Sequence, residues 1–268
     1  MAYKIHLLDN LNPIEWSQAV WRLEGEVPPT EACDRELIHR VMLDHLPKEG
    51  LIVDAGCGAG RWPIHLRRLG YRVMGVDISR QAVDIARADD PGLPMMLGDV
   101  RRIPLRDGSV DAVLSLGVVE HDERGPHEAL RETRRILKAG GLLILSVPFN
   151  NLLRRLVVNR MQTWVTRRRR RAQMKLGFVE YRFTRREVLR FLRETGFEPL
   201  SSYPNEYLPP KNVGIWVDWQ NLFFNPFHRR ARAELFQLPS PWDRVVGRVT
   251  KAAPWLVCGE VTVVARAR

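Results

Sequence analysis

The chain has 268 residues, of which 45% are hydrophobic and 27% are charged. This composition excludes collagen-like, wholly disordered and disulfide-scaffold proteins, and a chain of this length buries enough surface to need no disulfide or metal for stability. The formal net charge of +11 is uneven, because residues 1–147 sum to −3 and residues 148–268 sum to +14. Such an excess favours nucleic acid, anionic membranes or acidic ligands as partners, although an arginine-rich genomic composition would also produce it.

The three cysteines, Cys33, Cys57 and Cys258, match no metal-binding pattern and fit a reducing compartment. Residues 1–30 lack the basic and apolar regions of a signal peptide, and no apolar window is long enough for a membrane-spanning helix. We therefore expect a cytoplasmic protein, with peripheral contact at a membrane as the alternative placement.

The first half of the chain alternates between strand and helix patterns. Residues 14–47 have helical spacing of apolar side chains that ends at Pro47 and Gly50. The expected strands that follow cover residues 51–54, 72–77, 95–97, 111–116 and 142–147. The expected helices cover residues 62–69, 79–88 and 126–138, with Ser79 as an N-cap and Pro126 in a first turn. This alternation predicts a parallel α/β sheet.

The pattern loosens after Pro148. Residues 149–178 contain no acidic residue, and residues 184–196 have the pattern of a helix with a Thr184–Glu187 capping box. A strand is expected to start at Phe197, and a last strand over residues 261–265. Residues 203–256 are rich in proline and aromatic residues and show no clear period.

A glycine-rich turn lies between the first of these strands and its helix. Gly56, Gly58 and Gly60 follow Asp54, in the strand–turn–helix context that a nucleotide cofactor requires. Their spacing is G-x-G-x-G, and position 61, where a dinucleotide fingerprint would have its third glycine, is an arginine. A simple tight turn is the alternative interpretation.

Two acids at the ends of the next strands support a cofactor site. Asp77 is placed to accept hydrogen bonds from two ribose hydroxyls, a role shared by NAD and S-adenosylmethionine sites. Asp99 offers an acceptor where an adenine amino group would lie. The alternatives are a helix cap for Asp77 and a turn acid for Asp99.

The ordered motifs resemble those of class I S-adenosylmethionine-dependent methyltransferases, closest to the broad group that methylates small molecules. The resemblance covers roughly residues 40–200. The segments that carry it are LIVDAGCGAGRW (51–62), YRVMGVDISRQAVDIAR (71–87), GDVRRIPLRDGSVDAVLSLGVVEH (98–121), ALRETRRILKAGGLLILSVP (129–148) and FTRREVLRFLRETGFE (183–198).

The resemblance implies a Rossmann-like, doubly wound, seven-stranded sheet that is mostly parallel with an antiparallel last strand, with helical lid insertions. We expect an N-terminal helical cap, a cofactor-binding core, a basic lid insertion within it, an aromatic-rich insertion and a final core strand. These regions are residues 1–50, 51–200, 149–182, 201–256 and 257–268.

The resemblance also implies a role for each cofactor residue. Asp54 and the backbone of Gly56, Cys57, Gly58 and Gly60 would hold the methionine moiety of S-adenosyl-L-methionine. Asp77 would bind the ribose, Ile78 would pack on the adenine, and Asp99 with the Val100 amide would recognise the adenine. The backbone of Ser115, Leu116 and Gly117 would face the amino-acid portion. Arg61 would approach the cofactor carboxylate, or simply be solvated.

Methyl transfer from a sulfonium needs an aligned nucleophile, and a base only when that nucleophile arrives protonated. His121 is the candidate base, with shaping of the pocket as the alternative role. His65, His127 and His228 are interpreted as surface or helix histidines, and no cluster has metal-ligand spacing, so we predict no metal. Tyr207 and Lys211 resemble a reductase pair, but two intervening prolines exclude a shared helix face.

Three interpretations compete for the basic, amphipathic segment over residues 154–175: a substrate lid, a contact with anionic membrane, and RNA binding. Tyr181 is the candidate substrate residue from this region, together with His121. We predict methylation of O, N or C in a small, hydrophobic molecule. The alternatives are a non-catalytic cofactor-binding adaptor at a membrane and an RNA methyltransferase, with nucleic acid the least favoured partner. The sequence does not define the oligomeric state.

Overall fold

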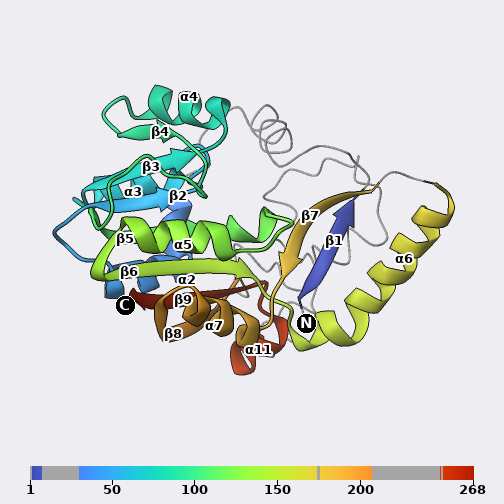
Figure 1. Cartoon of the computed structure of the whole chain (residues 1–268). Coiled ribbons are helices and arrows are strands. Elements are labelled where there is room, and N and C mark those ends of the chain that lie inside the picture. The colour runs from blue at the N-terminus through green and yellow to red at the C-terminus, as the bar shows by residue number, and fades with distance from the viewer. Residues whose placement is uncertain (1, 8–29, 174–175, 207–247, 249) are drawn as a thin grey trace.

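The computed structural model describes residues 2–7, 30–173, 176–206, 248 and 250–268. Its centre is a seven-stranded sheet with the strand order β4-β3-β2-β5-β6-β9-β8 (Figure 1). The strands are β2 (Ile52–Ala55), β3 (Val73–Asp77), β4 (Met95–Leu97), β5 (Val110–Leu116), β6 (Leu137–Pro148), β8 (Phe197–Asn205) and β9 (Glu260–Ala267).

The first five of these strands are parallel, and β9 runs antiparallel between β6 and β8. This is the predicted mostly parallel, doubly wound sheet with its antiparallel last strand. The order reverses beside β2, which lies between β3 and β5. In open α/β sheets such a switch point creates a crevice beyond the carboxyl ends of the strands, and ligands bind there.

Helices cover both faces of the sheet, because successive side chains of a strand point to opposite faces. Ile52 packs in the cluster formed with α2, α3 and α4, whereas its neighbour Val53 packs in the cluster formed with α5 and α7. Each fully buried aliphatic side chain contributes about 1.5–3 kcal/mol relative to exposure. These helices are α2 (Leu37–His45), α3 (Arg61–Arg68), α4 (Arg80–Asp89), α5 (His127–Ile136) and α7 (Arg185–Glu194).

The predicted caps at Ser79 and Thr184 are confirmed, whereas Pro126 is the N-cap of α5 and lies just before its first turn. The Ser79 side chain accepts a hydrogen bond from the Ala82 N–H, and Thr184 and Glu187 form a reciprocal capping box. One predicted helix end is wrong: α5 stops at Ile136 instead of Lys138, because Leu137 is buried and already pairs with Val110 of β5.

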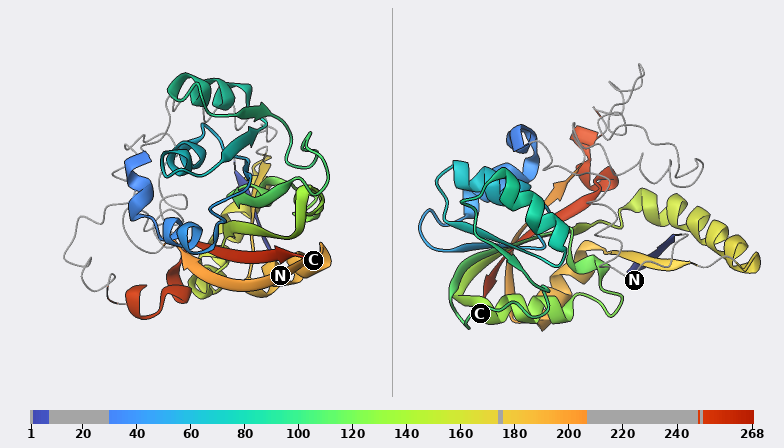
Figure 2. Two further views of the ribbon diagram at one scale, coloured as in Figure 1. Left: turned by 90° about the vertical axis from the view of Figure 1, so that its left-hand side faces the viewer. Right: turned by 90° about the horizontal axis from the view of Figure 1, so that it is seen from above.

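A second region lies outside the seven-stranded sheet. Strand β1 (Tyr3–Leu7) pairs antiparallel with β7 (Gly177–Arg182), so part of the expected N-terminal helical segment is a strand. A π-helical turn (Arg154–Val158) leads into α6 (Asn159–Arg171), which extends along one flank beyond the sheet (Figures 1 and 2). The short helix α11 (Pro254–Val257) precedes β9.

Much of the expected N-terminal cap and most of the aromatic-rich insertion over residues 201–256 lie outside the described residues. Within the described part, β8 continues to Asn205, past the expected core boundary at residue 200. The basic segment over residues 149–182 contains both α6 and β7.

Candidate functional site

The glycine-rich turn joins β2 to α3 at the switch point of the sheet. Gly56, Gly58 and Gly60 have φ values of +85°, +56° and +80°, a region that side chains disfavour. A Cβ atom at Gly56 would overlap the Val118 side chain, so the close packing also requires glycine there. The Val76 carbonyl of β3 fixes the turn by accepting hydrogen bonds from the Gly56 and Cys57 amides at 2.7 and 3.1 Å.

Asp77 ends β3 and links the glycine turn to the next helix. Its Oδ2 accepts a hydrogen bond from the Gly58 amide at 2.7 Å, and its Oδ1 accepts one from the Ser79 amide at 2.8 Å. The carboxyl is buried, and this burial raises its pKa. A carboxylate has about four acceptor positions, so hydroxyl donors can bind beside the two amides. The helix-cap interpretation and the ribose interpretation are therefore compatible.

Asp54 lies at the end of β2, next to the same turn. Its carboxyl is buried, and burial together with the nearby charge of Asp77 raises the pKa of Asp54 to about 8. Two close, buried carboxyls resist joint ionisation. This pair is suited to a ligand that brings hydroxyl groups and a positive charge.

Two residues of the turn are engaged elsewhere. The Cys57 Sγ lies 4.0 Å from the Met95 Sδ, and a Cβ at Gly75 would collide with both sulfur atoms. Cys57 therefore faces β3 and β4, which leaves its backbone as the part directed to a ligand. Arg61 forms an ion pair with Glu36, and both side chains are largely buried. The Arg61 side chain is therefore not simply solvated, because it is held by Glu36.

The adenine side of the site is more open. Asp99 follows β4, and its carboxylate is held by the Arg101 guanidinium, with Nη2 at 2.6 Å from Oδ2. Arg101 also lies 3.2 Å from the Asp122 carboxylate, so it links the Asp99 turn to the loop after β5. Ile78 and Val100 are both half-buried. The turn-acid description therefore applies to Asp99, and any adenine contact would share its carboxylate with Arg101.

The end of β5 supplies the opposite wall. Ser115 is buried, Leu116 is half-buried, and the Gly117 amide donates to the Ser146 carbonyl of β6 at 3.0 Å. Gly117 has a φ of +70°, so the chain turns sharply there. Val118, which the sequence did not single out, packs against Gly56 and closes the gap between the two loops.

His121 ends a 3₁₀ turn, η2 (Val119–His121), just past β5. Its Nδ1 lies 2.8 Å from the Val179 carbonyl of β7. A carbonyl only accepts hydrogen bonds, so Nδ1 carries the proton, and in the neutral ring Nε2 carries the basic lone pair. The Nε2 atom lies 3.9 Å from a Glu120 carboxylate oxygen.

Glu120 is a buried acid that the sequence analysis missed. Its side chain is 2% exposed, and its Oε2 has no hydrogen-bond partner among the described residues. Burial raises the pKa of Glu120 well above its usual range, because the charged carboxylate loses its hydration there. The sequence signal was an acid directly after two valines in a short turn.

Tyr181 lies on β7 in an aromatic group. Its ring is 5.5 Å from the Phe183 ring and 5.1 Å from the Phe178 ring, and its hydroxyl donates to the Glu123 carbonyl. The structure brings β7 against the His121 turn through Val179. The hydroxyl of Tyr181 itself is used within the protein, and its substrate role stays a prediction.

Comparison with known proteins agrees with this geometry. Residues 53–145 match the model of the family described as Methyltransferase domain. The malonyl-[acyl-carrier protein] O-methyltransferase of Yersinia pestis is 38% identical over 114 residues, which are 42% of this chain and 42% of that protein. The chain thus spans less than half the length of that curated relative.

Solved structures extend the likeness over the whole chain. A chain in complex with the Trm112 methyltransferase activator of Haloferax volcanii has a TM-score of 0.58 and 21% identity, covering 97% of this chain and 99% of that one. The geranyl diphosphate C-methyltransferase of Streptomyces coelicolor has a TM-score of 0.55 and 19% identity, covering 99% and 91%. At such identities the likeness shows a common fold.

The matched domain, the strand order and the glycine turn with its flanking acids together define the class. Residues 53–145 belong to a methyltransferase domain, and the fold is that of class I S-adenosylmethionine-dependent methyltransferases, whose cofactor is S-adenosylmethionine. The residues present fit this cofactor, since three glycines with positive φ form the turn and two buried carboxyls, Asp54 and Asp77, interact at the adjacent strand ends. None of the helices in the described residues combines the length and apolar character of a membrane span.

Proposed function

We propose that this protein transfers a methyl group from S-adenosylmethionine to O, N or C of a small, hydrophobic molecule. The observation that carries the proposal is the pair of buried carboxyls, Asp54 and Asp77, at the ends of neighbouring strands beside a turn of three positive-φ glycines. A parallel sheet binds its ligand at this edge, and hydroxyl and ammonium groups are the natural partners of such carboxyls.

The proposed contacts follow the order of the strands. Asp54 and the backbone of Gly56, Gly58 and Gly60 hold the methionine moiety, and Asp77 accepts hydrogen bonds from the ribose hydroxyls. Ile78, Asp99 and the Val100 amide surround the adenine. The backbone over residues 115–117 faces the amino-acid portion from β5.

The bound cofactor supplies a methyl group already activated by its sulfonium. The protein must align the acceptor in line with that methyl group and exclude water. We assign the proton acceptor to the Nε2 atom of His121, because Nδ1 is committed to the Val179 carbonyl. The buried Glu120 carboxyl lies 3.9 Å from Nε2, and its burial favours the uncharged form.

The class of methyl acceptor is inferred from the names of two similar proteins. The Yersinia relative is named for a malonyl-[acyl-carrier protein] acceptor and the Streptomyces structure for geranyl diphosphate. Both names describe acceptors with an apolar or acyl portion and an anionic end. The apolar and basic side chains near α6 are suited to such a molecule, and this likeness supports a small, hydrophobic acceptor over RNA.

Calorimetry with S-adenosylhomocysteine tests the cofactor site. The Asp77→Ala variant loses the acceptors proposed for the ribose, so binding should weaken by about 1–3 kcal/mol, roughly 5- to 150-fold. The control is Asp84→Ala, an exposed acid on α4 that should bind like the parent chain. Equal affinity in the two variants would contradict the ribose assignment, and binding without turnover of any acceptor would favour the adaptor alternative.

A second candidate function, contact with an anionic membrane surface, is favoured by α6 and the turn before it. Exposed apolar residues alternate there with exposed arginines, and Trp164 is 61% exposed with the Arg168 guanidinium 5.4 Å from its ring centre. The exposed apolar residues are Leu152, Leu156, Val157 and Trp164. Side chains four apart share a helix face, so Leu156, Arg160, Trp164 and Arg168 line one surface. Amphipathic, arginine-rich helices of this kind bind at the headgroup level of anionic lipids.

A further inference from the structure

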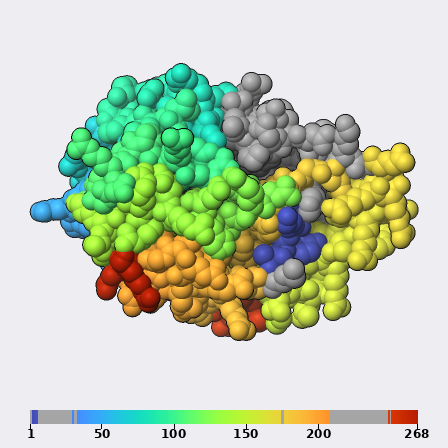
Figure 3. Space-filling view, in the orientation of Figure 1, coloured from blue at the N-terminus to red at the C-terminus, as the bar shows by residue number. Residues whose placement is uncertain are grey.

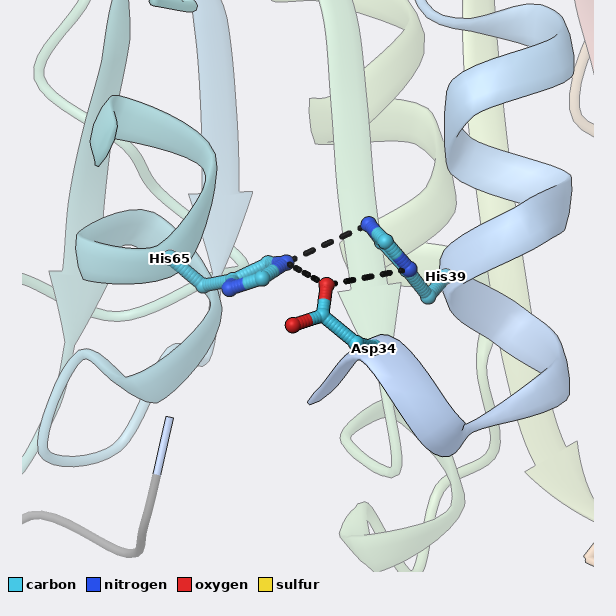
Figure 4. Close-up of side chains that lie close together, drawn as sticks. All are labelled: Asp34, His39 and His65. Atoms are coloured by element: carbon cyan, nitrogen blue, oxygen red, sulfur yellow. Dashed lines mark hydrogen bonds and ion pairs between the residues drawn. The ribbon is translucent and has the colours of Figure 1, made fainter. Parts of the chain in front are cut away.

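Three potential metal ligands from three separate elements meet on the α2–α3 side of the sheet (Figure 4). Asp34 lies in the 3₁₀ helix η1 (Thr30–Arg35), His39 in α2 and His65 in α3. Their ligand atoms all lie within 4.8 Å of one another. This group is separate from the acids and glycines of the proposed cofactor site, although α3 starts directly after the glycine turn.

The distances within the group suit a metal ion. The Nε2 atoms of His39 and His65 are 3.2 Å apart, and the Asp34 Oδ1 is 3.5 Å from the His65 Nε2 and 3.6 Å from the His39 Nδ1. A tetrahedral zinc ion with ligands at about 2.0–2.1 Å separates its ligand atoms by roughly 3.3–3.5 Å. These distances involve both nitrogens of His39, and only one of them would bind the ion. One ligand pair is therefore farther apart, within the 4.8 Å limit, and the side chains must move closer together around an ion.

The surroundings favour the neutral, metal-binding form of the imidazoles. His39 and His65 are 8% and 6% exposed, and burial together with the nearby His39 lowers the pKa of His65. The basic neighbours have other partners, since Arg61 pairs with Glu36 and Arg68 donates to Thr30. Asp34 is 63% exposed and supplies both a negative charge and an open side. That open side is where a water molecule or a fourth ligand would complete the coordination.

We propose that Asp34, His39 and His65 bind a divalent transition-metal ion of the zinc type. Two imidazole nitrogens and one carboxylate form a common ligand set for such ions. The bound ion would fasten η1 and α2 to α3, the helix that follows the glycine turn. The sequence prediction of no metal relied on spacing along the chain, and it treated His65 as a surface or helix histidine. His65 does lie on a helix, α3, but its side chain is buried there and faces a histidine 26 residues away.

The test uses the untagged 268-residue chain after treatment with a chelator and dialysis. Titration with Zn²⁺ against a chromophoric chelator should reveal one site per chain, and Co²⁺ should give the visible absorption of a low-coordinate site. His65→Gln removes one ligand, so affinity should fall by more than the roughly 10- to 100-fold that loss of an outer hydrogen-bond partner costs. Zn²⁺ should also raise the thermal midpoint of the parent chain and leave that of His65→Gln unchanged.

Two further variants keep the test independent of folding defects. Asp34→Asn changes an exposed side chain, so it should fold normally and still weaken Zn²⁺ binding at least tenfold. His45→Ala is the matched control, because His45 lies on α2 with its Nε2 bonded to the Tyr203 hydroxyl, and its Zn²⁺ affinity should equal the parent's. Absence of Zn²⁺ and Co²⁺ binding by the parent chain, or equal affinity in all four proteins, would overturn the proposal. The group would then be a hydrogen-bonded histidine pair, and the methyltransferase proposal would be unaffected.

Discussion

The carboxyl edge of the sheet and the outer surface of α6 differ in the sign and the exposure of their charged side chains. At the sheet edge, Asp54 and Asp77 are buried, and the backbone amides of Gly58 and Ser79 fix the Asp77 carboxylate. On α6, arginines and Trp164 are exposed to solvent. Figure 3 shows this segment, in yellow, at the right-hand margin of the molecule. The first arrangement is pre-organised for one small ligand, whereas the second can adapt to an extended anionic surface.

Arg154 lies at the boundary between these two regions, and the sequence analysis placed it in the basic, amphipathic segment over residues 154–175. Its guanidinium is buried, and Nη1 donates to the Phe149 and Gly259 carbonyls at 2.7 and 2.8 Å. The Asn151 side chain also donates to the Cys258 carbonyl at 3.0 Å. The start of the basic segment is thus anchored to Cys258 and Gly259, the two residues before β9. Only the later part of the basic segment is available to a partner.

The largest expected effect follows from removing this anchor. Arg154→Ala removes two hydrogen bonds from a buried charged group, although the Phe149 and Gly259 carbonyls each keep a backbone N–H donor. The free energy of unfolding should therefore fall by about 3 kcal/mol in urea denaturation. Its neighbour Arg155 is exposed, and Arg155→Ala should change stability by less than about 0.5 kcal/mol. Similar values for the two variants would contradict the anchoring role.

The same contrast explains which features the sequence predicted. The glycine turn, the strand-end acids and the caps at Ser79 and Thr184 depend on residues close together in the chain, so local patterns reveal them. The pairing of Tyr3 with Arg182 joins strands at distant positions, and no local period encodes it. The burial of Arg154 and the meeting of His39 with His65 also depend on tertiary packing, which overrides the usual surface preference of those residues.

A smaller effect is expected on the outer surface. The double variant Arg167→Gln and Arg168→Gln removes two exposed charges, and each contributes about 1 kcal/mol next to an anionic membrane. Partition onto vesicles of phosphatidylglycerol and phosphatidylcholine should therefore fall by about 2 kcal/mol, roughly 30-fold, at low salt. S-adenosylhomocysteine affinity should remain unchanged, because the sheet edge is intact.

The control is the double variant Arg186→Gln and Arg190→Gln on α7. It removes the same number of positive charges, also at two exposed positions. That variant should retain most of the vesicle binding. An equal loss in both double variants would show a net-charge effect without a specific surface. Binding to RNA but not to anionic vesicles, with a steep salt dependence, would favour the nucleic-acid alternative.

The smallest expected effect is the release of up to about one proton from the sheet edge when the cofactor product binds. Asp54 has a pKa of about 8 in the free chain, so it is mostly protonated at pH 7. If the ammonium group of the cofactor binds beside it, the positive charge favours the carboxylate, and the proton leaves. Calorimetry of S-adenosylhomocysteine binding in buffers of different ionisation enthalpy should therefore show release of up to about one proton.

Asp54→Asn should abolish this release, and adenosine, which lacks the ammonium group, should produce none in the parent chain. The raised pKa of Asp54 also predicts how the stability of the chain changes with pH. A raised pKa in the folded chain means that the stabilising contribution of this acid is complete below its unfolded pKa near 4 and is lost as the pH rises through about 8. Stability of the cofactor-free chain should thus decline over that interval, and the decline should be smaller in Asp54→Asn. Proton release that persists in this variant would place the titrating group elsewhere, and Asp54 would then be a packing residue of the glycine turn with no direct part in holding the ammonium.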